Sequence, residues 1–528
     1  MTNSFDELED ANCIFAIGSN TTVAHPLVAA RLFRARAKGN MLIVVDPRKT
    51  HLARIADIHV QHRLGTDVAL VNGMMHVIYK NGWHNETFMR ERTENPDVLI
   101  QMIEQYPPER AAEITGVDVS TIIRVAEHYA KSAASSIIYC LGITQHSTAV
   151  DNVKSLANLA MLCGQIGRPS TGVNPLRGQN NVQGACDMGG LPNVFPGYQA
   201  VTVPENREKF DAAWKAEMPP KPGLTIMEMM QGCIDGKIKG MVVLGENPVM
   251  SDPDSNHVKH ALQSAEFFMA IDIFPTPSTA LAHLVLPAAS FAEVDGTFTN
   301  SERRVQRVRR AIDPVAGKTN WQIIQELSTL LKYPMHYESA AEIFDEMARL
   351  TPSFAGISHS RLGTDGICWP CPSPDHPGTP ILHIGRFSRG LGLFHAVEWK
   401  PPAEIPDDEY DFWLTTGTEY AHYLTGSMTR RCEHLDSEMP ELITDLNPAD
   451  GERLEIKNGE YIRVTSRRGT LVSRVHLTER VKAGMIFMPL HFEEAAANLL
   501  TNAALDPISK TPEYKACGVR LEKIMQPA

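Results

Sequence analysis

One pattern in this sequence limits the possible folds more than any other feature, and it occurs twice. In its first occurrence, a short apolar run at 13–17 ends at a Gly18 turn. A stretch with helical spacing over 25–37 follows, and a second apolar run at 41–45 then ends at Asp46. A strand, a helix and a second buried strand in this order predict a βαβ unit, whose two strands are parallel.

The second occurrence has the same plan. The run 241–244 ends at Gly245, a helix-compatible stretch follows, and the run 267–271 ends at Asp272. Two such units predict two similar α/β domains, each able to hold one nucleotide. Neither turn has the GxGxxG fingerprint, which disfavours an ordinary nicotinamide-binding domain.

A glycine turn at the end of a strand still lets backbone approach a phosphate, and the helix that follows favours anions. The acid that ends the second strand can accept hydrogen bonds from a ribose hydroxyl or from a guanine N–H edge. In a single unit, Asp46 or Asp272 would more simply cap a loop. The duplicated pattern favours the nucleotide-binding interpretation.

Two further segments carry structural signals. Gly65-Thr66-Asp67 opens a helix, with Thr66 a fair N-cap. The last hundred or so residues change to alternating strands and turns, which predicts a small β-barrel after a boundary in the Pro-rich stretch 400–406. The strands expected there are 412–414, 453–456, 461–464, 471–475 and 485–488, with a hairpin turn at 457–460 and another turn at 467–470.

Composition excludes several classes of protein. A chain of 528 residues is too long for one core, so several domains are expected. Its net charge of −12 argues against a nucleic-acid binder. No apolar run is long enough for a membrane helix, and the acidic start has no signal core, so a cytoplasmic protein is the default.

The cysteines give no sign of a metal centre. There are nine, an odd number, and they are scattered as in a reduced protein. The one close pair, Cys368 and Cys371, has no second pair to complete a zinc or iron–sulfur site. Two reduced cysteines in a Pro-rich loop are the favoured interpretation.

The most informative stretch is 174–185, which is rich in amides and glycine and reads as too irregular for a helix or strand. Loops of this kind often line a ligand site, and one arginine among amides, Arg177, suits a small carboxylate. From the residue types alone, an arginine in a structural loop network is the preferred interpretation. The basic run 301–310 is either a solvated face or a surface for an anionic cofactor or partner subunit.

These residues resemble the molybdopterin-dependent oxidoreductases, most closely formate dehydrogenase catalytic subunits. The segment 171–197 is similar to that subfamily's substrate loop. The resemblance covers nearly the whole chain, with supporting matches at 45–48 with 53–57, 65–67, 141–145, 244–248 and 509–515.

The resemblance implies a multidomain α/β fold with two Rossmann-like α/β domains and a C-terminal six-stranded β-barrel. The domains it implies are a first α/β domain at 1–178 with a return segment at about 320–400, a second α/β domain at 179–290, a segment at 291–319 that packs near an iron–sulfur domain, and the barrel at 407–528.

The resemblance also implies a molybdenum or tungsten ion held by the dithiolenes of two pterin guanine dinucleotides, and an arginine, here Arg177, that orients formate. The remaining residues that it implies as cofactor contacts are Gly18, Asn20, Asp46, Pro47, Arg48, Gly65, Asp67, Leu141, Gln145, Gln179, Gly245, Glu246, Asn247, Asp272, Asn320, His422, Asn498, Tyr514 and Lys515.

The family pattern contains parts that this sequence lacks. Its metal-binding cysteine or selenocysteine, the histidine after it and four cysteines for a [4Fe–4S] cluster would all precede Met1. We therefore expect a partial catalytic chain, inactive alone, that begins after a selenocysteine codon read as a stop or belongs to a split subunit. Expected partners are formate or CO2 and iron–sulfur, NAD-reducing or hydrogenase subunits.

Three alternatives stay open at this stage. Another molybdopterin oxidoreductase, such as a nitrate reductase, is disfavoured by the Arg177 loop. A non-catalytic homologue without cofactor, as in one subunit of respiratory complex I, is disfavoured by the presence of Gln145, Arg177, Gln179, Tyr514 and Lys515. A plain NAD-dependent dehydrogenase lacks its glycine fingerprint.

Overall fold

The computed structural model describes residues 1–525. The chain divides into two compact units. Unit 1 consists of Met1–Leu176, Pro248–Val258 and Ile381–Ala528, and unit 2 consists of Arg177–Asn247 and Lys259–Pro380. Each unit is a mixture of strands and helices, which confirms the predicted α/β class.

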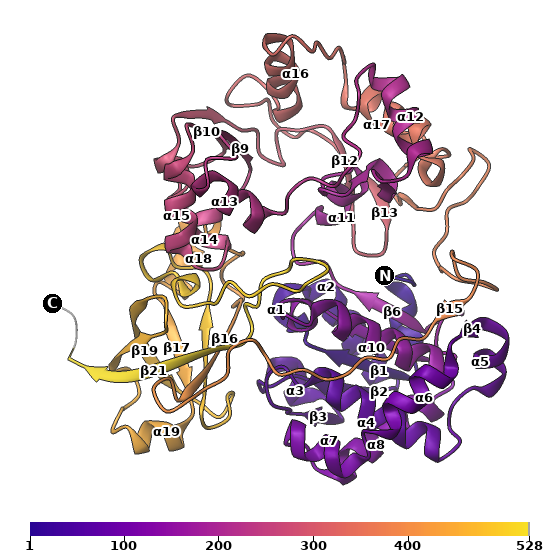
Figure 1. The fold of residues 1–528 in the computed structure, drawn as a ribbon, viewed down its shortest axis with the longest axis vertical. Coiled ribbons are helices and arrows are strands. Elements are labelled where there is room, and N and C mark those ends of the chain that lie inside the picture. The colour runs from indigo at the N-terminus through magenta and orange to yellow at the C-terminus, as the bar shows by residue number, and fades with distance from the viewer. Residues whose placement is uncertain (526–528) are drawn as a thin grey trace. The chain divides into compact units, whose positions relative to one another are not determined.

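Unit 1 contains a five-stranded parallel sheet in the order β3-β2-β1-β5-β6 (Figure 1). The strands are β1 (Cys13–Ile17), β2 (Met41–Val45), β3 (Ile58–Val60), β5 (Ser135–Tyr139) and β6 (Gly172–Pro175). The helices around the sheet are α2 (Pro26–Ala37), α3 (His51–Ile55), α4 (Asp67–Lys80), α5 (Glu86–Arg92), α6 (Pro96–Glu104), α7 (Pro108–Thr115), α8 (Val119–Lys131) and α10 (Ala149–Leu162). The first predicted βαβ unit is confirmed.

Burial explains why β1 lies at the centre of this sheet. All five of its residues are buried, and alternate side chains enter two different apolar clusters. Phe15 packs into one cluster with Ile43 and Ile137, and Ile14 packs into the other with Leu42 and Ile138. A strand covered on both faces has to be apolar at every position, and each large side chain that it buries contributes about 1.5–3 kcal/mol.

Unit 2 contains the second parallel sheet, in the order β11-β10-β9. Its strands are β9 (Gly240–Leu244), β10 (Phe267–Asp272) and β11 (Leu284–Pro287). Helix α15 (Ser255–Ser264) lies between β9 and β10 in the chain, so the second βαβ unit is also confirmed. The other longer helices of unit 2 are α12 (Pro204–Trp214), α13 (Ile226–Ile234), α16 (Asn320–Leu330) and α17 (Ala340–Leu350).

The basic run 301–310 lies in an antiparallel sheet of unit 2, formed by β12 (Gly296–Thr299), β13 (Arg304–Val308) and β14 (Ile367–Cys368). Several of its arginines are paired with carboxylates nearby, as in Arg304 with Glu302 and Arg307 with Asp295. Much of the positive charge in this run is therefore neutralised inside unit 2.

The C-terminal barrel of unit 1 is closed and has six strands, as expected, in the order β16-β20-β17-β19-β18-β21. The strands are β16 (Phe412–Gly417), β17 (Ile443–Leu446), β18 (Tyr461–Thr465), β19 (Thr470–Leu477), β20 (Met485–Pro489) and β21 (Cys517–Ile524). The turn predicted at 467–470 joins β18 to β19.

Three local predictions are wrong. No strand forms at 453–456, because helix α19 (Pro448–Arg453) continues to Arg453 and the chain then turns, so 457–460 is no hairpin turn. The stretch 174–185 is not irregular throughout, since β6 includes its start and helix α11 (Val182–Asp187) includes its end. Thr66 is at the N-cap of α4, but its hydroxyl donates to the Arg63 carbonyl instead of capping the helix.

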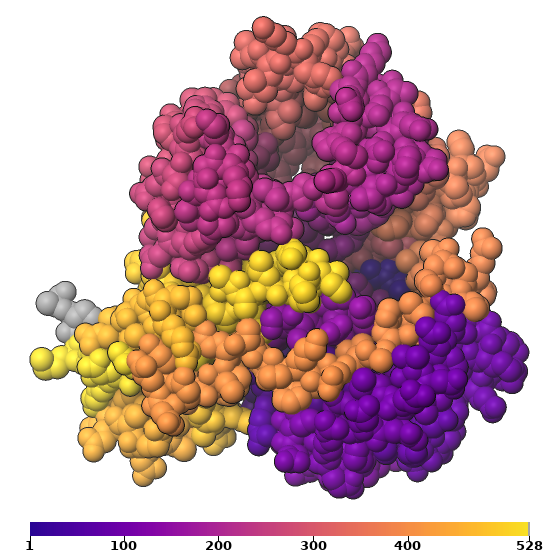
Figure 2. Space-filling view, viewed as in Figure 1, coloured from indigo at the N-terminus to yellow at the C-terminus, as the bar shows by residue number. Residues whose placement is uncertain are grey.

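A proline-rich segment joins the first α/β domain to the barrel within unit 1. It follows β15 (Gly392–Leu393) and crosses the first α/β domain as an extended band, coloured orange (Figures 1 and 2). The Val397 carbonyl accepts a hydrogen bond from Asn72, and the Trp399 indole N–H donates to the Gly65 carbonyl. These bonds fix the segment along its length.

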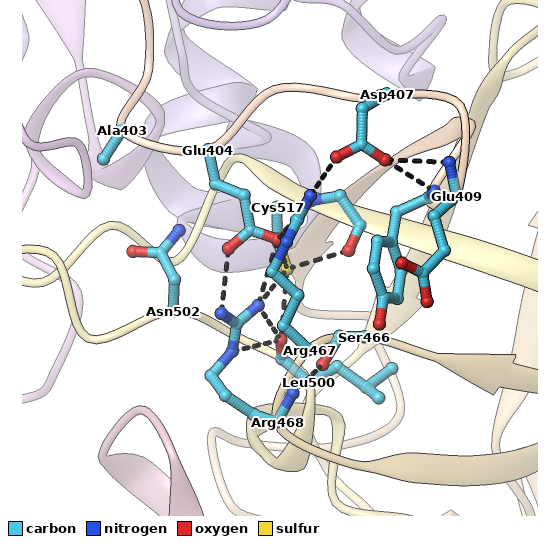
Figure 3. A network of polar contacts seen from close by, with 12 residues as sticks. Ala403, Glu404, Asp407, Glu409, Ser466, Arg467, Arg468, Leu500, Asn502 and Cys517 are labelled. Atoms are coloured by element: carbon cyan, nitrogen blue, oxygen red, sulfur yellow. Dashed lines mark hydrogen bonds and ion pairs between the residues drawn. The ribbon is translucent and has the colours of Figure 1, made fainter.

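Glu404 fastens the end of this segment to the barrel (Figure 3). Its carboxylate accepts from Arg467 Nη1 at 2.6 Å, from Arg468 Nη1 at 2.8 Å and from the Gly518 backbone N–H at 3.0 Å. Asp407 makes a further ion pair with Arg467. We call Glu404, Arg467 and Arg468 the linker clamp.

Within residues 1–525, no helix is long and apolar enough to cross a membrane.

Candidate functional site

The predicted ligand edge of the five-stranded sheet is the edge where β1, β2 and β5 end. The chain leaves β1 toward β2 and β3 on one side and returns to β5 and β6 on the other, so β1 and β5 flank a topological switch point. Open α/β sheets bind ligands in the crevice at such a point.

Two glycines let the segments that follow β1 and β5 approach each other closely at this switch point. Gly18 follows β1 with a φ of +57°, and the Gly142 N–H donates to its carbonyl at 3.0 Å. A Cβ on Gly142 would lie 2.6 Å from the Gly18 Cα, so only glycines allow the two backbones to touch. Leu141, a predicted contact, opens the short helix α9 (Leu141–Thr144) beside them, and Asn20 precedes the one-turn helix α1 (Thr21–Ala24).

Asp46 and Arg48 are buried at the end of β2. The Asp46 carboxylate accepts from the Arg48 backbone N–H at 2.8 Å, and the Pro47 carbonyl accepts from Gln61. The Arg48 guanidinium lies 3.6 Å from the centre of the Phe487 ring. Burial lowers the pKa of Arg48, although Asp46 and Glu419 act in the opposite direction.

Lys515 brings a second buried cation to the same edge. Its ammonium donates to the Thr416 carbonyl at 2.7 Å, and its backbone N–H donates to the Gln145 carbonyl. Burial, together with the charge of Arg48, lowers its pKa to about 8. The carbonyl of its neighbour Tyr514 accepts from the Thr416 hydroxyl. The structure therefore brings Asp46, Arg48, Gln145 and Lys515 together.

A residue that the sequence did not single out anchors this region. The buried Glu513 carboxylate accepts from the Ser147 hydroxyl at 2.9 Å, from the Ser147 N–H at 3.1 Å and from the Ala403 N–H at 2.9 Å. It thus ties the segment that carries Lys515 to the segment that carries Gln145. Glu513 lies inside the matched segment 509–515, but its residue type alone gave no signal that separates a buried anchor from a surface carboxylate.

Other predicted contacts in unit 1 are engaged by the protein itself. The buried His422 bonds through Nε2 to the Met439 carbonyl at 2.7 Å, and the Asn498 amide donates to the Met250 carbonyl at 2.8 Å. A Cβ on Gly65 would lie 2.3 Å from Pro402 Cγ, so the linker fills that space. Asp67 pairs with His62 at 3.1 Å. Burial alone would raise the pKa of Asp67, but His62 outweighs it and the pKa is lowered.

Unit 2 places its predicted residues at the corresponding ends of β9 and β10. Gly245 has a φ of +65°, and nothing lies within 4 Å of where its Cβ would be. Glu246 is exposed, whereas Asn247 is buried and accepts from the Ser278 hydroxyl at 2.7 Å. The Asp272 carboxylate accepts from the Ile273 N–H. Asn320 accepts from the Ala289 N–H at the start of α16.

The Arg177 loop is held firmly inside unit 2. The Arg177 N–H donates to the Ser301 hydroxyl at 2.9 Å, and its Nε donates to Gln183 Oε1 at 3.1 Å. Gln179, two residues further on, is exposed. Asn181 fixes the start of α11 by accepting from the Thr299 N–H at 2.9 Å.

The cysteine pair lies close to this loop's supporting residues. Cys368 and Cys371 are both free and buried, and the Trp369 indole between them donates to the Asp187 carboxylate at 2.9 Å. Among the described residues, no three His, Cys, Asp or Glu side chains form a group that could hold a metal ion.

Two family models match the chain. "Molybdopterin oxidoreductase" matches residues 1–330, and "Molydopterin dinucleotide binding domain" matches residues 412–518, which lie in the barrel.

Curated relatives match almost the whole chain. It is 47% identical to F420-dependent formate dehydrogenase 1 subunit alpha of Methanococcus maripaludis and 48% identical to F420-dependent formate dehydrogenase subunit alpha of Methanocaldococcus jannaschii, with 99% of this chain and 78% of each relative covered. It is 39% identical to formate dehydrogenase H of Escherichia coli, with 99% of this chain and 74% of the relative covered.

A solved structure supports the fold. Acetylene hydratase from Pelobacter acetylenicus superposes with a TM-score of 0.77 over 99% of this chain and 79% of its own, at 19% identity.

The residues of unit 1 fit a large anionic nucleotide. Gln145 Oε1 and Arg48 Nη1 are buried and make no hydrogen bond within residues 1–525. A buried polar atom without a partner costs about 1–3 kcal/mol, so a ligand that satisfied both atoms would recover that cost. The lowered pKa of Lys515 also indicates that the neighbouring groups stabilise its charged form only in part. In unit 2, the open space beside Gly245 leaves room for a ligand to approach the backbone.

Proposed function

The chain belongs to the molybdopterin oxidoreductase family, and from that premise we propose that its function is that of a formate dehydrogenase catalytic subunit. The observation that supports this most directly is identity of 47–48% to two formate dehydrogenase alpha subunits over 99% of the chain. The reaction is the reversible oxidation of formate: the C–H bond breaks, a proton and two electrons leave, and CO2 forms.

Arg177 is the residue we propose to bind formate. A guanidinium is always charged and presents paired N–H donors that match the two oxygens of a carboxylate. Its Nε donates to Gln183 Oε1, a bond that helps to set the orientation of the guanidinium group. By holding both oxygens, Arg177 would fix the direction of the C–H bond before it breaks.

We propose that the dinucleotides are held by the remaining predicted residues. In unit 1, Gly18 and Gly142 would admit a phosphate or ribose close to the backbone, and Arg48 and Lys515 would offset its negative charge. Gln145 would supply its amide oxygen, which has no hydrogen-bond partner within residues 1–525. In unit 2, Gly245 would admit a phosphate or ribose close to the backbone, as Gly18 would in unit 1. Asp272 would accept a hydrogen bond from a ribose hydroxyl or a guanine edge.

When bound, the pterin cofactor supplies a sulfur-ligated metal that accepts the two electrons. Molybdenum or tungsten both suit such soft ligands, and we extend the proposal to either metal with two guanine dinucleotides. We also propose an iron–sulfur cluster in the assembled enzyme and electron-transfer partner subunits. Because two of the relatives are named F420-dependent, F420 is the acceptor to test first, beside NAD and ferredoxin.

Formate oxidation by the purified native enzyme tests this proposal. Arg177→Lys keeps the charge but loses the paired donors, so kcat/KM for formate should fall about 10- to 100-fold. Metal and pterin content should not change. The matched control is Arg310→Lys, because Arg310 forms an exposed ion pair with Asp313 in the same unit. This variant should have the same kcat/KM for formate as the native enzyme.

Two outcomes would contradict the proposal. One is a native enzyme that carries its metal and pterin and does not oxidise formate with any of the acceptors or with an artificial dye. The other is an Arg177→Lys enzyme with unchanged kcat/KM.

A further inference from the structure

A chain of hydrogen bonds inside unit 2 begins at Arg177 and ends at a buried acid. Arg177 Nε donates to Gln183 Oε1 at 3.1 Å, and Gln183 Nε2 donates to Asp187 Oδ1 at 2.8 Å. Gln183 and Asp187 are four residues apart on α11 and therefore lie on the same face of the helix. Asp187 is 1% exposed and Gln183 is 5% exposed, so water does not compete for these bonds.

The Asp187 carboxylate determines which way the Gln183 side-chain amide is oriented. Gln183 could present either its oxygen or its amide nitrogen to Arg177, but only the oxygen can accept from the Nε–H. An ionised Asp187 accepts and cannot donate, so it selects the orientation in which the Gln183 amide nitrogen points to it. The amide oxygen is then turned toward Arg177.

Neighbouring side chains keep Asp187 in place. The Trp369 indole N–H donates to its second oxygen, Oδ2, at 2.9 Å. Gln183 Nε2 also donates to the Tyr198 hydroxyl at 2.8 Å, which fixes the amide from another side. The buried Arg303 in turn donates to the carbonyls of Trp369 and Thr379 and so braces the segment that carries the indole.

The Gly184 position shows how closely this helix is fitted. A Cβ there would lie 2.1 Å from Asn181 Oδ1, the atom that accepts from Thr299 N–H. Because Gly184 has no side chain, Asn181 can bond to Thr299 of β12 and fix the first turn of α11. Gln183 and Asp187 are therefore carried on a helix with a fixed position.

From this geometry we propose that Asp187 is a positioning residue for the substrate-binding arginine, acting through Gln183 to hold the Arg177 guanidinium in the orientation that receives formate. This inference deepens the proposed function and rests on Arg177 as the formate ligand. It assigns a positioning role to a side chain that does not itself touch the substrate.

The protonation of Asp187 should then affect formate binding. Burial raises its pKa to about 6, while hydrogen bonds from Gln183, Trp369, Tyr198 and Thr299 act in the opposite direction. The other titratable or charged groups that interact with it or with this cluster are Cys186, Tyr198, Arg177 and Arg303. A protonated Asp187 carries an O–H that competes with its role as an acceptor, so Gln183 is no longer held in one orientation.

The test is the KM for formate of the native holoenzyme as a function of pH. Asp187→Asn should raise KM about tenfold near pH 7.5, the size expected for one bond to a charged group, with kcat changed less than about twofold. The native KM should rise as pH falls through about 6, where formate itself stays ionised, and the KM of the variant should not. Asp295→Asn removes a carboxylate bonded to Arg307 in the same unit and should leave both the KM and its pH dependence as in the native enzyme.

A crystal structure of the Asp187→Asn protein gives a second measurement that does not need activity. The Arg177 Nε to Gln183 Oε1 contact should be lost. Should the variant fail to accumulate, Gln183→Leu removes the same acceptor and should give the same rise in KM.

The outcomes separate the two proposals. If Arg177→Lys weakens formate use while Asp187→Asn leaves both KM and the 3.1 Å contact unchanged, the positioning role is wrong and the proposed function stands. If the native enzyme does not oxidise formate, the proposed function is wrong, and the variant structure still decides whether Asp187 orients Arg177.

Discussion

Replacing Glu404 by glutamine should loosen the attachment of the linker to the barrel. In the native chain one carboxylate serves two guanidinium groups and a backbone N–H (Figure 3). The Glu404 side chain is only 12% exposed, so solvent screens these interactions weakly. Glutamine keeps one acceptor oxygen, removes the charge and turns an N–H group toward donors.

The magnitude follows from the exposure of the partners. The Arg468 pair is largely buried, and losing a bond to a charged group there costs about 1.5–3 kcal/mol. The Arg467 pair is about one third exposed and also has Asp407 as a partner, so its loss costs less than about 1 kcal/mol. Together they predict a local destabilisation of about 2–3 kcal/mol.

Native-state hydrogen exchange measures this cost without assuming that the whole chain unfolds in one step. The opening free energy of the Gly518 N–H, which donates to Glu404, should fall by about 2–3 kcal/mol. Proteolysis within 400–406 should become faster.

The matched control is Glu522→Gln on the same barrel. Glu522 pairs with Arg463 at 2.7 Å, but the two side chains are 63% and 44% exposed, so its loss should cost less than about 0.5 kcal/mol. Equal exchange rates in the Glu404 and Glu522 variants would refute the reasoning that burial makes the linker clamp strong.

Two further changes test the ligand edge of unit 1. Lys515→Met should stabilise the cofactor-free chain near neutral pH by up to about 3 kcal/mol, because burial lowers the lysine pKa from 10.5 to about 8, yet it should weaken pterin retention. The free energy of unfolding of the native chain should therefore rise with pH between about 8 and 10.5, where the unfolded chain binds more protons than the folded chain. If the Lys515→Met chain showed the same rise, this account would be contradicted. Gly142→Ala should cost about 1–3 kcal/mol in thermal unfolding, because its Cβ meets Gly18 backbone at 2.6 Å. Gly240→Ala is the matched control, because Gly240, like Gly142, has no positive φ and its Cβ would meet only the Phe267 carbonyl at 3.9 Å. It should cost less, and equal losses would show that the Gly18 contact is irrelevant.

Local sequence determined much of the fold. Strands that are buried on both faces must be apolar at every position, so β1 and β2 were visible as continuous apolar runs. The apolar runs of β9 and β10 were also visible, although β9 is exposed at three of its five residues. Their glycine and aspartate ends identified the edges where a ligand could bind. The prediction at 453–456 failed because alternation over four residues is also compatible with the end of a short helix, and packing decided between them.

The candidate site, like the fold, could be predicted from the sequence only in part. Arg177 was singled out as a candidate because one arginine among amides is a local signal, and its role as the formate ligand is a prediction that the family resemblance implies. The sequence did not single out the residues behind Arg177, which are Gln183, Asp187 and Trp369. Trp369 is far along the chain, and helix α11 was not expected. The sequence by itself thus determined the two α/β units, the barrel and the choice of Arg177. Only the tertiary structure decided which acids are buried against which donors, because hydrogen-bond partners and desolvation depend on contacts between segments distant in the chain.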